Sequence, residues 1–190
     1  MDAAVLQAMA RWPQVPRCTG WLALDQRGQW WMRHQQGPAI WPRDAQGRLD
    51  KTDAGPVLHE GLAAFIGRNY TCDVQGSWYF QNGPQRVDVS LETAPWIVRL
   101  HHDPVQGSSW HTHTGLPCTP QELWLDAQGR VWLRTELGPA LLHSNDMPLF
   151  ATLLDAQDDR MLCAGNAALP LGTFSQEPEA ILGFRRDPGV

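Results

Sequence analysis

The sequence has few charged residues, no basic cluster and no long apolar run. Charged residues make up 18% of its 190 positions, Lys51 is the only lysine, and the formal net charge is −5. Proteins that bind nucleic acid through its phosphates need a basic patch, so this class is disfavoured. No apolar run approaches the roughly 20 residues that cross a bilayer, and residues 1–12 lack the regions of a signal peptide. We therefore expect a cytoplasmic protein with neither a nucleic-acid nor a membrane partner.

Short catalytic and metal-binding motifs are also missing. The four cysteines, Cys18, Cys72, Cys118 and Cys163, are widely separated and form no C-x-x-C pair, which favours reduced and mostly buried thiols. There is no G-x-S-x-G elbow, no Gly-rich phosphate loop and no H-E-x-x-H. With 43% hydrophobic residues, the composition is that of a globular protein, and the missing motifs give little support to nucleophilic catalysis.

Part of the sequence occurs twice, at a constant offset of 101 residues. Composition alone would give roughly one identity over such a stretch, but nine positions are identical. They are Leu22, Leu24, Asp25, Gly28, Trp31, Arg33, Gly37, Pro38 and Ala39, which match Leu123, Leu125, Asp126, Gly129, Trp132, Arg134, Gly138, Pro139 and Ala140. We interpret this pattern as a diverged tandem duplication.

Each copy contains D-x-x-G between apolar runs, which is typical of a β-hairpin with Gly in the left-handed position of its turn. In the second copy this register pairs Trp124 with Trp132 and Glu122 with Arg134, and it places only apolar residues on the inner face. The predicted inner faces are Leu123, Leu125, Val131 and Leu133 in the second copy, and Leu22, Leu24, Trp30 and Met32 in the first. The outer face of the first copy then carries Trp21, Ala23, Trp31 and Arg33.

Further elements are predicted by the same reasoning. A third D-x-x-G, at residues 73–76, predicts a hairpin with Tyr70, Cys72, Trp78 and Phe80 inside, whereas residues 44–47 have polar flanks and predict a loop turn. Strand 85–92 is expected to bury Val87, Val89 and Leu91 and to expose Arg86, Asp88 and Ser90. Short third strands are expected at 39–41 and 140–143, with weak strands at 161–164 and 180–185. The helical face of 57–67 contains Leu58, Leu62, Phe65 and Ile66.

These elements predict an α+β protein of antiparallel β-meanders with a few short helices, built from two related units of hairpin, strand and helix. The first unit, 1–92, comprises an N-terminal helix, hairpin 21–33, helix 57–67 and meander 70–92. The second, 93–190, comprises hairpins 95–114 and 122–134, helix 147–155 and weak strands in the tail. The two units either share one core or form two lobes.

The best candidate for a ligand site is the turn after Phe80. Gln81, Asn82 and Gln85 place amides beside Arg86, and an arginine with neighbouring amides suits a carboxylate or phosphate. We add Trp96 to this candidate set. The alternative is plain turn chemistry, in which Asn82-Gly83 turns the chain and Arg86 faces solvent.

A candidate interaction surface occurs in both copies. Trp31 and Arg33 in the first copy match Trp132 and Arg134 in the second, and an arginine over an indole is a cation–π pair. The pairs either pack within the protein or form a partner surface, which could also join two copies as a homodimer. Packing is favoured, since large exposed tryptophan faces are rare in soluble monomers.

Three histidines form the best metal candidate. On a hairpin over 95–114, His101, His111 and His113 could share one face and bind zinc or another divalent ion, with Asp103 or Cys118 completing the set. Cys118 is expected to be the more exposed thiol and could pair with a histidine, whereas Cys72 is expected to be buried and inert. The alternative is a polar rim that contacts water.

The chain also contains a specific string, Phe80-Gln-Asn-Gly-Pro-Gln-Arg86, within W-Y-F-Q-N-G-P-Q-R-V at 78–87. Leu91-Glu92, Pro95-Trp96, residues 12–25 and His113-Thr114-Gly115 accompany it. Together these residues resemble an uncharacterised family of small β-proteobacterial proteins, over about the first two thirds of the chain. The resemblance implies a cytoplasmic bacterial protein and no particular activity.

From the residues, the leading hypothesis is a non-catalytic module that binds a protein partner or a small ligand and holds no cofactor. Two alternatives stay open. One is a metal-dependent, hydrolase-like enzyme that uses the histidines, and the other is a small-anion sensor centred on Arg86.

Overall fold

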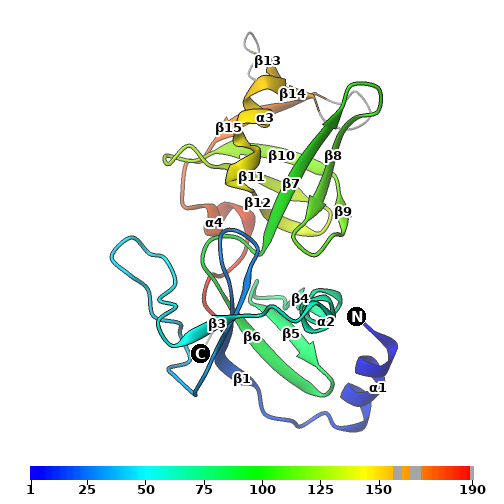
Figure 1. The fold of residues 1–190 in the computed structure, drawn as a ribbon, viewed down its shortest axis with the longest axis vertical. Helices are drawn as coiled ribbons and strands as arrows, with labels where there is room; N and C mark the ends of the chain where they lie inside the picture. Colours follow the sequence, from blue (N-terminus) through cyan, green and yellow to red (C-terminus); the bar gives the residue numbers. More distant parts are fainter. Residues whose placement is uncertain (156–159, 163–167, 189–190) are drawn as a thin grey trace. The chain divides into compact units, whose positions relative to one another are not determined.

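The computed structural model describes residues 1–155, 160–162 and 168–188 (Figure 1). The chain forms two compact units. Unit 1 comprises Met1–Thr93 and Phe184–Val190, and unit 2 comprises Ala94–Gly183. Each unit is built on its own β-sheet with a few short helices, so the fold is α+β and mostly β. Among the described residues, no helix is long and apolar enough to cross a membrane.

The sheet of unit 1 has six strands in the order β3-β2-β1-β6-β5-β4. In chain order they are β1 (Cys18–Leu24), β2 (Trp30–Arg33), β3 (Ala54–Pro56), β4 (Tyr70–Cys72), β5 (Trp78–Asn82) and β6 (Gln85–Leu91). Helix α1 (Ala3–Arg11) precedes β1, and α2 (Glu60–Arg68) connects β3 to β4. The α2 helix packs on the sheet through Phe65, whose ring meets that of Phe80 edge-on at 5.4 Å.

The sheet of unit 2 has nine strands in the order β13-β14-β15-β10-β11-β12-β7-β8-β9. In chain order they are β7 (Trp96–Asp103), β8 (Gly107–Thr112), β9 (Pro117–Cys118), β10 (Pro120–Leu125), β11 (Val131–Thr135), β12 (Gly138–Leu142), β13 (Leu154–Asp155), β14 (Arg160–Leu162) and β15 (Ala168–Thr173). The helices are the 3₁₀ turn η1 (Ser144–Asp146), α3 (Met147–Leu153) and α4 (Pro178–Leu182).

Six strands of unit 2 repeat the order found in unit 1. Strands β12, β11, β10, β15, β14 and β13 are neighbours in the same sequence as β3, β2, β1, β6, β5 and β4. The central pair is parallel in both, β1 with β6 and β10 with β15. A helix follows the third strand in each case, α2 in unit 1 and α3 in unit 2. Strands β7–β9 extend the second sheet beyond β12.

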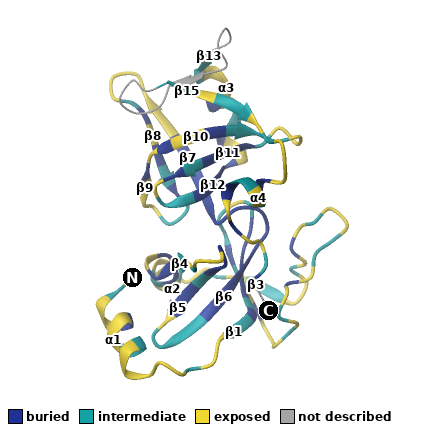
Figure 2. Cartoon of the chain, turned by 180° about the vertical axis from the view of Figure 1, so that it is seen from behind, coloured by how far each residue is buried: buried dark blue, intermediate teal, exposed yellow. Residues whose placement is uncertain are grey.

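The hairpins 21–33 and 122–134 have the predicted register. In the first hairpin Leu24 pairs with Trp30 and Leu22 with Met32. In the second hairpin Trp124 pairs with Trp132, as its predicted register requires. The glycine of each turn has a positive φ, 82° at Gly28 and 74° at Gly129, as the D-x-x-G pattern requires. The strands carry most of the buried residues of both units (Figure 2).

The expected antiparallel meanders form most of both sheets, but each sheet is mixed and also contains parallel pairs. The parallel pairs β1–β6, β10–β15 and β7–β12 join strands that are distant in sequence. Turn residues indicate only antiparallel strands that are adjacent in the sequence. The long connections between the parallel strands leave no such local pattern.

The third strand of unit 1 also differs from the prediction. It is formed by Ala54–Pro56, which pairs with β2, and not by 39–41. Gly37 instead packs closely against the Arg33 side chain, since a Cβ atom added to Gly37 would lie 2.2 Å from Arg33 Nη1. The Pro38 carbonyl accepts a hydrogen bond from the same Arg33 nitrogen. Residues 34–53 therefore form a long connection. It includes the predicted loop turn, in which the Asp44 carboxylate accepts from the Gln46 and Arg48 N–H groups.

The expected helices and tail strands have shifted bounds. The helix expected at 57–67 spans Glu60–Arg68, and Leu58, expected inside, is 77% exposed. The helix expected at 147–155 ends at Leu153. In the tail, the strand expected at 161–164 is β14, Arg160–Leu162, with 163–164 outside the described residues. The strand expected at 180–185 overlaps α4, Pro178–Leu182, whose proline suits the first helical turn.

Several faces are buried against expectation. Ala23 and Arg33, expected outside, are buried, because Trp41 and Leu49 of the 34–53 connection cover that side of the hairpin. Met32, expected inside, is partly exposed. Asp88 and Ser90 of β6 are buried as well. The two sides of this sheet are therefore both covered, and alternation alone does not separate core from solvent.

Candidate functional site

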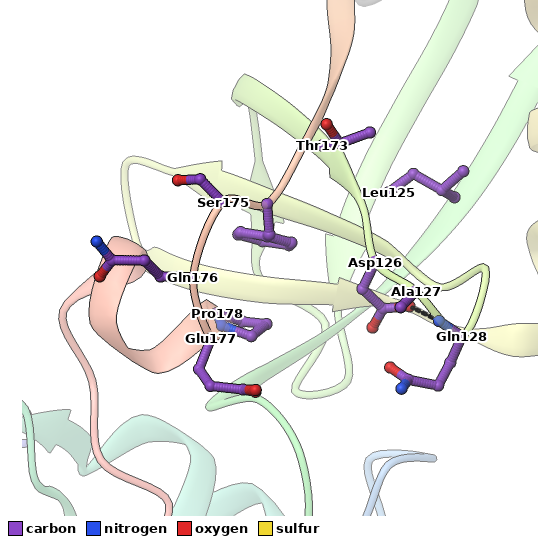
Figure 3. Close-up of a pocket in the computed structure, with 10 residues that line it drawn as sticks. Leu125, Asp126, Ala127, Gln128, Thr173, Ser175, Gln176, Glu177 and Pro178 are labelled. Carbon is purple, nitrogen blue, oxygen red and sulfur yellow. Dashed lines mark hydrogen bonds between the residues drawn. The ribbon is translucent and has the colours of Figure 1, made fainter.

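A cavity of about 480 Å³ lies in unit 2 where β10 and β15 end (Figure 3). Two segments line it, the turn that follows β10 and the segment that connects β15 to α4. The lining residues are Leu125, Asp126, Ala127, Gln128, Thr173, Phe174, Ser175, Gln176, Glu177 and Pro178.

The parallel pairing of β10 and β15 explains why a hollow forms here. Leu125 and Thr173 are the last paired residues, and both strands run in the same direction. Beyond them the chain leaves β10 in a tight turn and leaves β15 toward α4. Both strands end on the same side of the sheet, and among the described residues no strand lies between their exits.

Asp126 forms one wall and accepts four hydrogen bonds. Its Oδ1 accepts from the backbone N–H groups of Gln128 and Arg130, each at 2.9 Å. Its Oδ2 accepts from the Trp132 indole at 2.8 Å and from Arg130 Nε at 2.7 Å. Burial alone would raise the pKa of this carboxyl, but the Trp132 and Arg130 donors lower it below its ordinary value. The group is therefore a fixed anion.

The segment after β15 forms the opposite wall, which is aromatic at Phe174 and polar from Ser175 to Glu177. Phe174 stacks on Trp124 with ring centroids 5.5 Å apart, and it meets Trp132 edge-on at 6.1 Å. Past Phe174 the wall continues through Ser175, Gln176 and Glu177. In Figure 3 the Glu177 side chain reaches toward the side of the Asp126 turn, whereas Gln176 points the other way. The ten described lining residues include two carboxylates and no basic side chain.

In unit 1 the matching turn is contacted by the 34–53 connection. Asp25 repeats the geometry of Asp126, with Oδ1 accepting from Arg27 and Gln29 N–H groups and Oδ2 accepting from the Trp31 indole at 2.9 Å. Its fourth donor is Lys51 of the 34–53 connection, whose Nζ lies 2.8 Å from Oδ2.

Lys51, which is partly buried, links two buried carboxylates. Its ammonium also lies 3.5 Å from Glu92 Oε2 and 4.6 Å from the centroid of the Trp31 ring. Arg43 donates to the Leu91 carbonyl at 2.9 Å, at the end of β6. Where unit 2 has a cavity after its central parallel pair, unit 1 has the two cationic side chains of its own connection.

The amide-rich turn around Arg86 is not an open anion site. The Arg86 guanidinium donates to Asp73 at 2.8 Å and to Asp88 at 2.7 Å, and it lies 4.1 Å from the Tyr79 ring centroid. Asp88 is 0% exposed and also accepts from Arg17 at 2.8 Å. Burial would lower the pKa of Arg86, but Asp88 and Asp73 raise it above its ordinary value. The arginine is thus a fixed cation that two carboxylates already neutralise.

The other members of that candidate set have separate contacts. Gln81 is buried and donates to the Gly83 carbonyl at 3.0 Å, and Gln85 donates to the Pro16 carbonyl at 3.4 Å. Asn82 is exposed at the turn. Trp96 belongs to unit 2, where it is buried and its indole donates to the Leu137 carbonyl at 2.8 Å.

The repeated tryptophan and arginine pairs are mostly packed. Arg33 and Trp132 are buried, and Trp31 and Arg134 are half-buried. Arg33 lies over Trp41 at 4.5 Å, and Arg134 lies over Trp124 at 5.8 Å, so neither arginine stacks on the predicted tryptophan. This arrangement corresponds to the packing alternative. The indoles of Trp31 and Trp132 serve instead as donors to Asp25 and Asp126.

The histidine hairpin brings only part of its set together. The rings of His101 and His111 lie 6.1 Å apart. His113 instead packs on Trp96 at 5.5 Å, and its Nδ1 accepts from the Ile97 N–H at 3.3 Å. Within the described parts of the chain, no group of three or more His, Cys, Asp or Glu side chains is arranged to hold a metal ion.

The exposure of Cys118 and Cys72 is the reverse of the prediction. Cys118 is buried, and burial together with Glu136 raises its pKa to about 12, so it is a protonated thiol at neutral pH. Cys72, expected inside, is exposed, although burial of its thiol still raises its pKa. The strand that carries Cys118 has only two residues, which is too short for side-chain alternation to predict.

Sequence reasoning missed the cavity because residues 173–178 contain no motif. One signal was available for its other wall. In both copies a tryptophan follows the turn aspartate by six residues, as in Asp25–Trp31 and Asp126–Trp132. The capped turn brings that indole back onto the carboxylate, so the identical spacing marks a paired carboxylate and indole as well as a turn.

Two solved structures are similar to the chain, and the first of them supports the fold. The chain is similar to the crystal structure of a DUF1285 family protein from Silicibacter pomeroyi DSS-3, with a TM-score of 0.56 and 14% identity over 91% of this chain and 96% of that one. A DUF1285 family protein from Shewanella baltica OS155 matches with a TM-score of 0.44 and 15% identity over 69% of this chain and 90% of that one.

Comparison with curated protein sequences gives no match. The sequence profile of DUF2944, described as "Protein of unknown function (DUF2946)", matches residues 1–189. This agrees with the resemblance to an uncharacterised family. The chain belongs to this family of unknown function.

Proposed function

We propose that the chain is a non-catalytic binding protein built from two copies of one module, and that the cavity of unit 2 holds its ligand. The order of strands and helix within each unit and the repeated aspartate–indole contact support the duplication. A reducing, cytoplasmic setting is part of the proposal, and the free thiols of Cys18, Cys72 and Cys118 agree with it.

One observation carries the proposal. The place that unit 1 fills with Lys51 and Arg43 is an open cavity of about 480 Å³ in unit 2. The size is within the range of about 300–1,000 Å³ that is usual for small-molecule sites. A hollow with an aromatic wall and a few fixed polar groups is also the usual composition of such sites.

The lining indicates the chemistry of the ligand. Arg130 already neutralises Asp126, so Glu177 supplies the remaining negative charge. Gln128 and Ser175 add neutral polar groups, and Phe174 offers an apolar surface. A ligand with an alkyl stem and a guanidinium or ammonium head matches this set. The ligand is either a free amine or a basic side chain of a partner protein.

Titration of ¹⁵N-labelled protein with n-butylguanidinium tests the proposal, with butyrate as the probe of opposite charge. We expect chemical-shift changes at 125–128 and 173–178 with the cation only. Glu177→Gln should weaken binding by about tenfold, which corresponds to 1.4 kcal/mol. Glu60→Gln in α2 of unit 1 is the matched control for charge and should leave binding unchanged.

A peptide arm separates the two sources of the cation. A partner protein predicts that Gly-Gly-Arg-Gly-Gly binds more tightly than n-butylguanidinium at the same residues, and a free amine predicts the reverse. Equal shifts with butyrate, or no shifts at 125–128 and 173–178 with any of the three probes, would exclude the proposed site.

A further inference from the structure

Arg33 of unit 1 is a buried arginine with an unused donor. Its side chain is largely enclosed, the residue being 7% exposed, and its guanidinium lies over the Trp41 ring. Nη1 donates to the Pro38 carbonyl at 3.0 Å. Nη2 is buried and has no hydrogen-bond partner among the described residues. A buried donor without an acceptor is unfavourable, so a group that supplies the acceptor would bind favourably.

The matching arginine of unit 2 shows which group that position takes. Arg134 donates through Nε to the Glu122 carboxylate at 2.9 Å and through Nη2 to the Ile181 carbonyl at 3.2 Å. At the offset of 101, the residue that matches Glu122 is Trp21. Unit 1 therefore has the matching arginine, Arg33, but has no carboxylate at the position from which Glu122 neutralises Arg134 in unit 2.

Arg33 lines a cavity of about 100 Å³ that the 34–53 connection forms and that is open to solvent. A single water needs only about 10–15 Å³, so the space admits a ligand of several heavy atoms. Gly37 keeps the backbone close to the guanidinium, since a Cβ atom there would lie 2.2 Å from Nη1. The other lining residues are Gln35, Gln36, Pro38, Pro42, Asp50 and Asp53.

The charges in this cavity are of both signs. Burial lowers the pKa of Arg33, whereas Asp50 and Asp53 act in the opposite direction and favour its charged form. Both aspartates are exposed, and Asp50 Oδ1 is already held by Thr52. A simple anion would meet the field of two carboxylates, and a simple cation would meet the buried guanidinium. A ligand with both charges satisfies each end.

We propose that this cavity binds a small zwitterion of the size of glycine, with its carboxylate on Arg33 and its ammonium facing Asp50 and Asp53. The amides of Gln35 and Gln36 complete the polar lining. The site is separate from the cavity of unit 2 and does not depend on the function proposed for that cavity.

Titration of ¹⁵N-labelled full-length protein with glycine tests this inference, with acetate and methylamine as the single-charge probes at matched ionic strength. We expect glycine to shift signals at 33–38 and 50–53 and to bind at least about tenfold more tightly than either probe. Arg33→Met keeps the buried stem and removes the donors, so it should abolish binding. Asp53→Asn, at an exposed position, should weaken binding while leaving the fold intact.

Arg48→Met is the matched control, because the Arg48 side chain is 61% exposed and does not line the cavity. It should bind glycine like the unmodified protein. Acetate binding as tightly as glycine, glycine binding that survives in Arg33→Met, or no shift at 33–38 and 50–53 in the unmodified protein would each overturn the inference. Since both cavities are read from separate sets of signals, failure here leaves the proposal for unit 2 standing, and the reverse also holds.

Discussion

The two units carry the same aspartate–indole hairpin but differ in the segment after it. After β2, residues 34–53 intervene before the third strand, whereas after β11 only Glu136 and Leu137 do. The long connection of unit 1 brings Lys51 to Asp25 and covers Ala23 with Trp41. In unit 2 the corresponding face is covered by Phe174 and leaves a cavity beside Asp126. One unit is therefore closed by its own loop, and the other is left open.

The greatest loss of stability should come from removing the cation of unit 1. Lys51→Met leaves Asp25 and Glu92 buried without their shared ammonium. Breaking a buried ion pair by removing one partner costs about 3–5 kcal/mol, and the 29% exposure of the Lys51 side chain places the expected loss near the lower end, at about 3 kcal/mol. Urea unfolding gives the free energy, and hydrogen exchange should show the loss in β1 and β2.

The exposed pair between Arg48 and Asp44 supplies the control, because Arg48→Met should change stability by less than about 1 kcal/mol. Equal effects of Lys51→Met and Arg48→Met would mean that Lys51 does not close unit 1.

Removing the indole donors should give a smaller effect that differs between the units. Trp31→Phe and Trp132→Phe each take one N–H away from a buried carboxylate, which costs about 1–3 kcal/mol. Trp132 is the more buried and also contacts Phe174, so we expect about 2 kcal/mol for Trp132→Phe and about 1 kcal/mol for Trp31→Phe. The same urea series measures both. A larger loss in Trp31→Phe would contradict this order.

A still weaker effect, shared by both units, is a loss of stability in acid. Burial raises the pKa of Asp25 and Asp126, but their donors lower it below the ordinary value of 3.8. Both carboxylates therefore stabilise the folded state fully above pH 3.8, and this contribution is lost as the pH falls through the lower folded-state values. Unfolding free energies measured from about pH 6 down to about pH 3 should decline, less steeply in Asp126→Asn. A decline that is unchanged in this variant would remove Asp126 from the explanation.

Local patterns predicted the hairpins correctly but not how the strands combine. The register of β10 and β11 follows from a capped turn and alternating leucines, which are properties of adjacent residues. The parallel partner β15 lies far along the chain, and nothing near Leu123 indicates it.

The candidate sites were harder to predict for the same reason. Arg86 was identified as a possible ligand group, but its partners Asp73 and Asp88 were expected to face a turn and the solvent. The sequence Gly-Pro-Ala occurs at 37–39 and at 138–140. At 138–140 it begins β12, whereas at 37–39 it lies in the long connection of unit 1. Identical residues thus adopt different structures, since β2 pairs with Ala54–Pro56 in unit 1, whereas β11 pairs with β12 in unit 2.

Titration with n-butylguanidinium, followed by ¹⁵N chemical shifts, decides whether unit 2 is open where unit 1 is closed. We expect changes at 125–128 and 173–178 that weaken in Glu177→Gln, and no change at Asp25, Trp31 or Lys51, where the protein supplies its own cation. Shifts that occur at both hairpins, or that persist unchanged in Glu177→Gln, would refute this difference between the units.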